Sequence, residues 1–221
     1  RRFHAQPNAC ANCGPHVSLW DNRLNQIPAE NTIEKKAELL KQGFILAVKG
    51  LGGYHLAADA ANPEAVRRLR SRKMREEKPF AVMSYDIESV LRYALVGPEE
   101  EKLLTSIRRP IVLLKKKFPN PISEYVSPQN KYFGVMLPYS GVLALLASAF
   151  PKPIIATSGN RHGSPICHRP EEAREKLRGV ADFFFEHDLE ILHPQDDSVV
   201  RFTPSGQRIM LRRSRGFAPN A

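Results

Sequence analysis

The sequence lacks a long apolar run and any leader-like segment at its start. Within its 221 residues there is no stretch of about 18 apolar residues, so we expect no membrane-spanning helix. The first ten residues, RRFHAQPNAC, are polar and contain no apolar core of the kind that a secretory signal peptide requires. We therefore expect a cytoplasmic protein with no membrane partner.

The chain is also poor in cysteine, with three residues of this type. Three thiols cannot all pair, and a disulfide framework is not expected at this length. Cys10 and Cys13 form the segment CANCGP, a knuckle of the zinc-ribbon type, whereas Cys167 is isolated. A structural zinc site needs four ligands, so the knuckle supplies half a site. We expect zinc only with further cysteines upstream, unless His4, His16 or a second chain contributes.

Several common catalytic signatures are missing: the Walker A phosphate loop, the HExxH motif and the GxSxG motif. Residues 50–55, GLGGYH, come close to the dinucleotide-binding pattern GxGxxG. However, His55 replaces the third glycine and no helix opens directly after it, so a Rossmann interpretation is weak. A tight turn after a strand explains the segment equally well.

Positive charge is what the chain has in excess. Its formal net charge is +10 and its pI is about 9.7. Such a balance favours attraction to nucleic acid, nucleotides or anionic small molecules, without choosing among them, although surface lysines can also merely confer solubility.

Part of this charge is concentrated in residues 69–84, LRSRKMREEKPFAVMS, where Arg70, Arg72, Lys73, Arg75 and Lys78 fall within nine positions. Neighbours three apart on a helix share a face, so a phosphate chain could be held there by charge-assisted hydrogen bonds. The alternative is a solvated helix face. The absence of acidic residues between 67 and 75 weakens that alternative.

Polar residues also follow an apolar strand at ATSGNRHGSPI, residues 156–166. Hydroxyls and amides at the carboxyl end of a strand can form an oxyanion or nucleotide site, or simply a turn. We expect this segment to lie across a cavity from the cationic helix. Asp196 and Asp197 could hold magnesium, but we favour charge balance with the arginines of residues 212–215.

Helical and strand patterns alternate through the middle of the chain, and strands cluster at its end. Helices are predicted near 32–42, 63–73, 86–94, 98–106, 140–150 and 170–177. Strands are predicted near 17–20, 44–49, 79–83, 110–116, 153–158, 182–188, 198–204 and 208–213. This order predicts a mixed α/β sheet in one domain.

Six segments resemble the YrdC-like domain of the HypF family of hydrogenase maturation carbamoyltransferases. They occur in the family's order: AVKGLGGYHLAADA, LRSRKMREEKPFAVM, GVMLPYS, IIATSGN, DDSVVR and RRSRGFAP. The leading RRFHAQPNACANCGP resembles the last cysteine knuckle of that family's zinc-finger-like region. The resemblance implies an α/β fold with a twisted mixed sheet flanked by helices and a basic open cavity.

The resemblance also implies roles for particular residues. The broader YrdC/Sua5 family has a Lys-x-Arg pair and a Ser-x-Asn pair lining its cavity, which Lys73 with Arg75 and Ser158 with Asn160 match. The implied reaction joins carbamate to the α-phosphate of ATP with magnesium, releasing pyrophosphate and forming carbamoyl-adenylate. We expect further nucleotide contacts from one group of residues: Arg72, Lys78, Thr157, Arg213 and Arg215.

Some positions depart from the family pattern. Ser140 to Leu145 replace the usual threonine-proline and paired histidines after MLPY, Arg161 to Ser164 displace a hydroxyl, and Glu76 replaces a frequent proline. We therefore carry no family role over to those positions.

The resemblance suggests a division into residues 1–25, the end of a zinc-finger-like region, 26–215, a YrdC-like domain, and 216–221, a linker to a Kae1-like domain. We expect the chain to be a fragment of a larger enzyme that passes the carbamoyl group to HypE, for the cyanide ligands of nickel–iron hydrogenase. The alternatives are a double-stranded RNA or tRNA-binding module and an enzyme like threonylcarbamoyl-adenylate synthase. The cationic cluster lacks interleaved aromatic residues, which argues against RNA.

Overall fold

The computed structural model describes residues 14–28, 32–161 and 163–218. The helices are α1 (Thr32–Lys41), α2 (Pro63–Lys73), α3 (Ile87–Leu91), α4 (Pro98–Thr105), η1 (Glu124–Val126), α5 (Gly141–Ala149) and α6 (Pro170–Leu177). The strands are β1 (Val17–Asp21), β2 (Gln26–Ile27), β3 (Leu46–Lys49), β4 (Tyr54–Asp59), β5 (Ala81–Met83), β6 (Ala94–Leu95), β7 (Ile111–Lys116), β8 (Tyr132–Met136), β9 (Ile154–Ser158), β10 (Phe183–His187), β11 (Val199–Phe202) and β12 (Arg208–Arg212). None of the described helices is both long and apolar enough to span a bilayer.

One mixed sheet organises the molecule, in the order β12-β11-β7-β8-β5-β9-β4-β3-β10-β1-β2, with β6 paired to β7. The pairs β11–β7, β5–β8 and β10–β3 are parallel, and the remaining pairs are antiparallel. The predicted mixed α/β fold is therefore confirmed.

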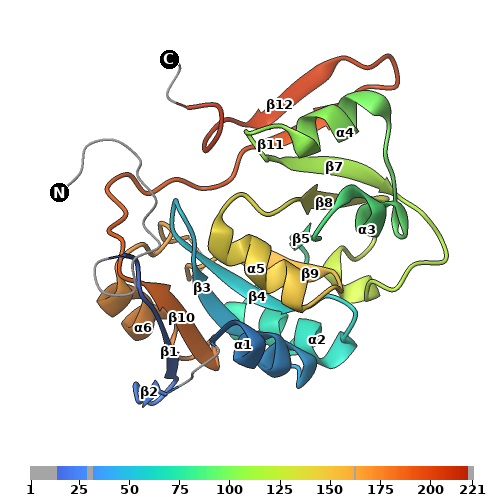
Figure 1. Cartoon of the computed structure of the whole chain (residues 1–221). Coiled ribbons are helices and arrows are strands. Elements are labelled where there is room, and N and C mark those ends of the chain that lie inside the picture. The colour runs from blue at the N-terminus through green and yellow to red at the C-terminus, as the bar shows by residue number, and fades with distance from the viewer. Residues whose placement is uncertain (1–13, 29–31, 162, 219–221) are drawn as a thin grey trace.

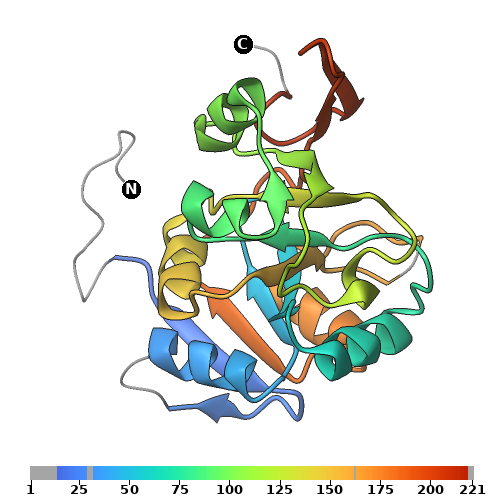
Figure 2. The same ribbon diagram turned by 90° about the vertical axis from the view of Figure 1, so that its right-hand side faces the viewer.

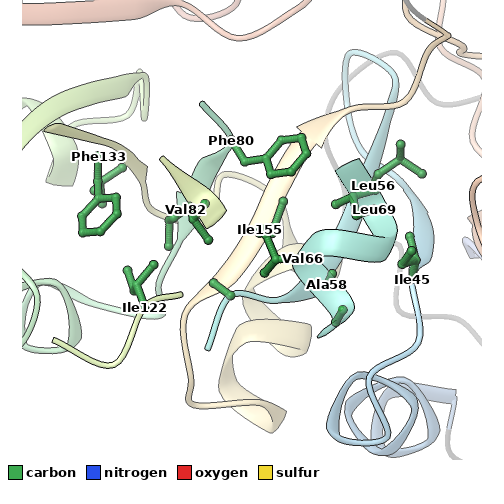
Figure 3. Close-up of a cluster of buried hydrophobic side chains, with 14 of the residues drawn as sticks. Ile45, Leu56, Ala58, Val66, Leu69, Phe80, Val82, Ile122, Phe133 and Ile155 are labelled. Carbon is green, nitrogen blue, oxygen red and sulfur yellow. The ribbon is translucent and has the colours of Figure 1, made fainter. Parts of the chain in front are cut away.

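Helices cover both faces of this sheet (Figures 1 and 2). On one face α1 and α5 bury Leu40 and Leu146 against β3, β9 and β10. On the other face the core includes side chains of α2 and α6, with Val66 and Leu69 of α2 packed near Ile155 and Phe80 (Figure 3). Apolar burial of this kind is the main stabilising contribution to such a sheet.

Helix α2 has clear start and stop signals in the sequence. The side chain of Asn62 accepts hydrogen bonds from the backbone N–H groups of Glu64 and Ala65, and Pro63 occupies the first turn, where no N–H partner is needed. Met74 ends the helix in the left-handed conformation, with φ of 49°. The chain therefore changes direction between Lys73 and Arg75.

Two strands in the middle of the sheet were not predicted. β4 contains His55 and Asp59 yet is buried along its whole length, and β8 contains Gly134, so neither shows the apolar run or alternation typical of a strand. In addition, β1 pairs with β10 in the main sheet. The described end of region 1–25 therefore contributes a strand to the sheet.

Candidate functional site

A cavity of about 1060 Å³ lies beside three segments that are distant in the sequence. These are the end of α2 with the loop after it, the end of β9, and the segment from Asp196 to Arg212 that includes β11 and β12. The described lining contains cations, among them Lys73, Arg75 and Arg212, but also the carboxylates of Asp196 and Asp197. The described lining also includes Glu76 and Glu77, so it holds side chains of both charges.

Lys73 joins the helix to the loop after β9. Its Nζ donates to the backbone oxygens of Ser158 and Asn160 and to Oδ1 of Asn160, the last two at 2.9 Å. Burial, and then the neighbouring charge of Arg75, lower the pKa of Lys73 to about 7. The ammonium is therefore held in a desolvated place at the cavity wall.

The Ser158–Asn160 loop is in direct contact with the cationic helix, which corrects the expectation that the two lie on opposite sides of the cavity. Ser158 Oγ donates to Asn160 Oδ1 at 2.9 Å, and Asn160 Nδ2 donates to the Ser164 backbone oxygen at 2.6 Å. Gly159 between them donates its N–H to Tyr54 O, and a Cβ at Gly159 would meet that oxygen at 2.8 Å. Glycine is therefore required where this loop crosses β4.

Arg75, which follows Met74 in the sequence, contacts the same loop. Its Nη1 donates to Thr157 Oγ1 at 3.2 Å, and its Nη2 donates to the Pro79 backbone oxygen at 2.7 Å. Burial, and then the charge of Arg70, lower the pKa of Arg75 to about 10. The structure thus brings together Lys73, Arg75, Thr157, Ser158 and Asn160, all of which line the cavity.

Of the other residues expected to contact a nucleotide, some line the cavity and some do not. Lys78 lines the cavity, but Arg72 does not: its Nη1 lies 2.7 Å from Asp182 Oδ1 and also donates to Val180 O. Arg213 donates to the Phe217 backbone oxygen, and Arg215 lies over the ring of Tyr139, 3.4 Å from its centroid. Neither Arg213 nor Arg215 is among the described residues that line the cavity.

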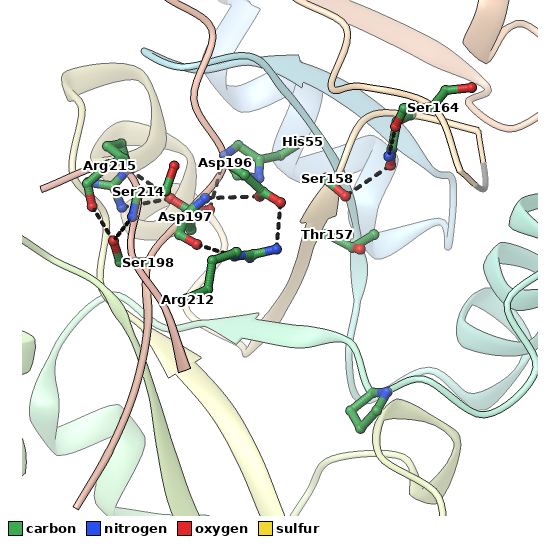
Figure 4. Close-up of polar contacts among 12 residues, drawn as sticks. His55, Thr157, Ser158, Ser164, Asp196, Asp197, Ser198, Arg212, Ser214 and Arg215 are labelled. Atoms are coloured by element: carbon green, nitrogen blue, oxygen red, sulfur yellow. Dashed lines mark hydrogen bonds and ion pairs between the residues drawn. The ribbon is translucent and has the colours of Figure 1, made fainter. Parts of the chain in front are cut away.

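The two aspartates are paired with arginines, as the sequence favoured. Asp196 Oδ2 lies 2.6 Å from Arg212 Nη1, and Asp197 Oδ1 lies 2.7 Å from Arg215 Nη2 (Figure 4). Ser198 Oγ also donates to the Arg215 backbone oxygen. These contacts tie the start of β11 to the segment after β12, which closes one side of the cavity.

Behind Asp197, the buried His55 and the half-buried Tyr139 form a polar pair that the sequence analysis did not identify. His55 Nε2 lies 2.6 Å from Tyr139 Oη and 3.7 Å from Asp197 Oδ2. Burial raises the pKa of Tyr139, so its hydroxyl stays protonated. Both residues belong to segments that carry the family resemblance, GLGGYH and MLPYS, but spacing gives no sign that the two meet.

Cys10 and Cys13 lie outside the described residues, so the predicted zinc half-site has no structural account. Among the residues that the structure does describe, no group of three or more histidine, cysteine or acidic side chains is arranged to hold a metal ion.

Comparison with known proteins identifies relatives over nearly the whole chain. The Sua5/YciO/YrdC family model, described as "Telomere recombination", matches residues 38–214, and the "HypF finger" model matches residues 1–20. The carbamoyltransferase HypF of Rhodobacter capsulatus is 45% identical over 219 residues, 99% of this chain and 29% of that protein. A threonylcarbamoyl-AMP synthase of Vibrio parahaemolyticus is 26% identical over 66% of this chain and 82% of that protein.

Among solved structures, full-length HypF in a phosphate- and nucleotide-bound form superposes with a TM-score of 0.90 and 47% identity. The match covers 99% of this chain and 28% of that one, so the chain spans less than a third of the HypF proteins described here. Because the family model covers most of the chain, including every residue named at the cavity, the chain belongs to the Sua5/YciO/YrdC family.

Proposed function

We propose that this chain adenylates carbamate: a carbamate oxygen attacks the α-phosphorus of ATP, the bond to the β-phosphate oxygen breaks, and pyrophosphate leaves. The observation that carries the proposal is that Lys73 contacts Ser158 and Asn160 while Arg75 contacts Thr157, all at one cavity wall. The product would be carbamoyl-adenylate, which fits the names of relatives that transfer carbamoyl groups or make threonylcarbamoyl-AMP.

The charges of the wall suit this reaction. Negative charge is redistributed over the phosphoryl oxygens as pyrophosphate leaves, and fixed cationic donors stabilise that charge. We propose that Arg75 and Lys78 bind the phosphate chain, while Lys73 fixes the Ser158–Asn160 loop and adds its own charge. No protein nucleophile is required, which agrees with the absence of a catalytic-serine motif.

Within the part of the chain that the structure describes, no group of three or more histidine, cysteine or acidic side chains could hold magnesium, and Asp196 and Asp197 are both engaged by arginines. We propose that a magnesium ion enters already bound to the phosphate oxygens of the nucleotide, as is usual for such complexes. We further propose that in a longer protein the carbamoyl group passes to HypE, and that zinc is bound by Cys10 and Cys13 with cysteines from elsewhere.

The test is ATP–pyrophosphate exchange in ammonium bicarbonate, whose solutions contain carbamate. Asn160→Ala removes the side-chain acceptor of both Lys73 and Ser158, so we expect exchange to fall about 100-fold with the fold intact. Asn22→Ala, on the exposed turn after β1, is the matched control and should keep full exchange. Full exchange by Asn160→Ala would refute the assignment of this loop.

The same variant separates the competing proposals. Duplex RNA binding depends on many dispersed cations, so removal of one neutral side chain should leave RNA affinity unchanged. If Asn160→Ala lost RNA affinity in parallel with exchange, the cavity would have to be assigned to nucleic acid. Exchange that requires L-threonine together with bicarbonate would instead indicate a threonylcarbamoyl-adenylate synthase.

A further inference from the structure

One cation of the 69–84 cluster has no role in the proposed chemistry. Arg70 is 9% exposed and is not among the described residues that line the cavity. Its guanidinium packs over the ring of Phe80, 4.5 Å from the centroid. Burial of a guanidinium is costly unless its N–H groups find acceptors, so its partners indicate what it does.

All of the hydrogen-bond acceptors of Arg70 are backbone carbonyl oxygens. Nη1 donates to the oxygens of Arg75, Glu76 and Lys78 at 2.7, 2.9 and 3.3 Å. Nε and Nη2 donate to the oxygens of Tyr125 and Val126, in the short helix η1. Arg70 thus joins the loop of residues 75–79 to η1 through a single planar group.

This loop has little else to hold its shape. Residues 76–78 are exposed, and within the described chain residues 76–79 form no backbone–backbone hydrogen bonds. The remaining support comes from Arg75, whose Nε and Nη2 donate to the oxygens of Lys78 and Pro79. The loop is therefore wrapped around two guanidinium groups, Arg70 on its inner side and Arg75 on the cavity side.

We propose that Arg70 is a positioning residue that orders the 75–79 loop and so presents Arg75 and Lys78 to the phosphates of the nucleotide. The inference rests on the proposed function. Arginine suits this task because its donors point in several fixed directions from one plane, whereas a lysine ammonium is a single flexible point. Arg70 acts through the loop and does not itself contact the ligand.

The test combines a double-mutant cycle with proteolysis. We expect Arg70→Met to weaken the Kd for magnesium–ATP about tenfold or more, because two cations lose their fixed geometry. Because Arg70 acts through Arg75 as well as through Lys78, the effects of Arg70→Met and Arg75→Ala on the Kd should be less than additive in the double variant. Lys102→Gln is the matched control, since Lys102 is an exposed cation on α4 and is not among the described residues that line the cavity.

Two further measurements test whether Arg70 orders the loop, rather than merely stabilising the protein or supplying a positive charge. Trypsin should cleave after Arg75 faster in Arg70→Met than in the wild type, at a temperature where both are folded. Arg70→Lys keeps the charge but cannot span the five carbonyl oxygens, so it should rescue the Kd only in part. Full rescue by Arg70→Lys, additive effects in the cycle, or an unchanged Kd in Arg70→Met would overturn the inference.

The outcome also separates this inference from the proposed function. A wild-type chain that binds no ATP would refute the proposed nucleotide site, and the cleavage rates would still decide whether Arg70 orders the loop. A wild-type chain that binds ATP, with Arg70→Met binding equally well, would refute the role of Arg70 alone.

Discussion

The desolvated ammonium of Lys73 makes a quantitative prediction about nucleotide binding. Burial and Arg75 lower its pKa to about 7, so at pH 8 about nine-tenths of the side chains are neutral in the free protein. A bound triphosphate places negative charge at the cavity wall and should return this pKa toward its ordinary value near 10.5. Binding of ATP should therefore take up a proton.

The size of the effect follows from these two pKa values. Proton uptake should be about 0.9 per ATP at pH 8, about 0.5 at pH 7 and about 0.1 at pH 6. The affinity should accordingly fall about 50-fold between pH 7 and pH 9, because free protein must acquire the proton before it binds well. Arg75, with a pKa of about 10, stays charged over most of this range.

Calorimetry at pH 8 in HEPES and in Tris, which differ in ionisation enthalpy, measures the uptake directly. Phosphate buffer should be avoided because it is itself an anion that the cavity would bind. The matched control is Lys73→Arg, which keeps a positive charge that does not titrate at pH 8, so its uptake should vanish while binding persists. ATP binding without uptake by the wild type, or equal uptake by Lys73→Arg, would refute this reasoning.

Two predictions concern stability. Lys36 is fully buried, and its Nζ has no hydrogen-bond partner in the described structure. The Nζ lies 3.0 Å from the centroid of the Phe185 ring, and burial lowers the pKa of Lys36 to about 6. The unfolded chain therefore holds a proton that the folded chain lacks between pH 6 and about 10.5, so this group makes stability rise with pH by up to about 1.4 kcal/mol per unit. Lys36→Met should be more stable than the wild type, most of all at pH 5, in urea titrations; a gain independent of pH would contradict this. Gly159→Ala should destabilise the protein by about 1–3 kcal/mol in thermal unfolding, because the new Cβ would meet Tyr54, whereas Gly141→Ala, with open space at the start of α5, should be neutral or stabilising. Equal effects of the two glycine substitutions would refute the close approach to β4.

Elements with a simple pattern could be predicted from the sequence. The strands β3, β7 and β9 are apolar runs, and α2 has a capping asparagine followed by proline. β4 could not be recognised because its burial is supported by polar partners from elsewhere in the fold. His55, for example, meets Tyr139, which follows it by 84 positions in the sequence. Hydrophobic periodicity depends on which residues are apolar. It does not show which polar residues find a hydrogen-bond partner in the fold.

Prediction of the candidate site from the sequence is limited in a similar way. The family resemblance implied that residues 73, 75, 158 and 160 line one cavity, but not that Lys73 and Asn160 would touch. Nor did spacing show that Arg72 would turn away toward Asp182. The reason is the left-handed residue Met74, which ends the helix and makes the helical spacing of Arg72, Arg75 and Lys78 meaningless. A side chain with no special preference for that conformation gives little warning of the turn.

The way in which these cations are held explains how they can crowd together and still serve an anionic ligand. Arg70, Lys73 and Arg75 are bound mainly by backbone carbonyl oxygens, and within the described residues none of the three forms an ion pair with a carboxylate. A carbonyl dipole orients a cation and offsets part of its desolvation without cancelling its full charge, whereas a carboxylate would cancel it. Arg72, which faces away from the cavity, is the member that does pair with a carboxylate, Asp182. At the cavity, Arg75 thus keeps its charge without a carboxylate partner, and Lys73 would take up a proton as the nucleotide binds, so the phosphates would supply the counter-charge for these two side chains.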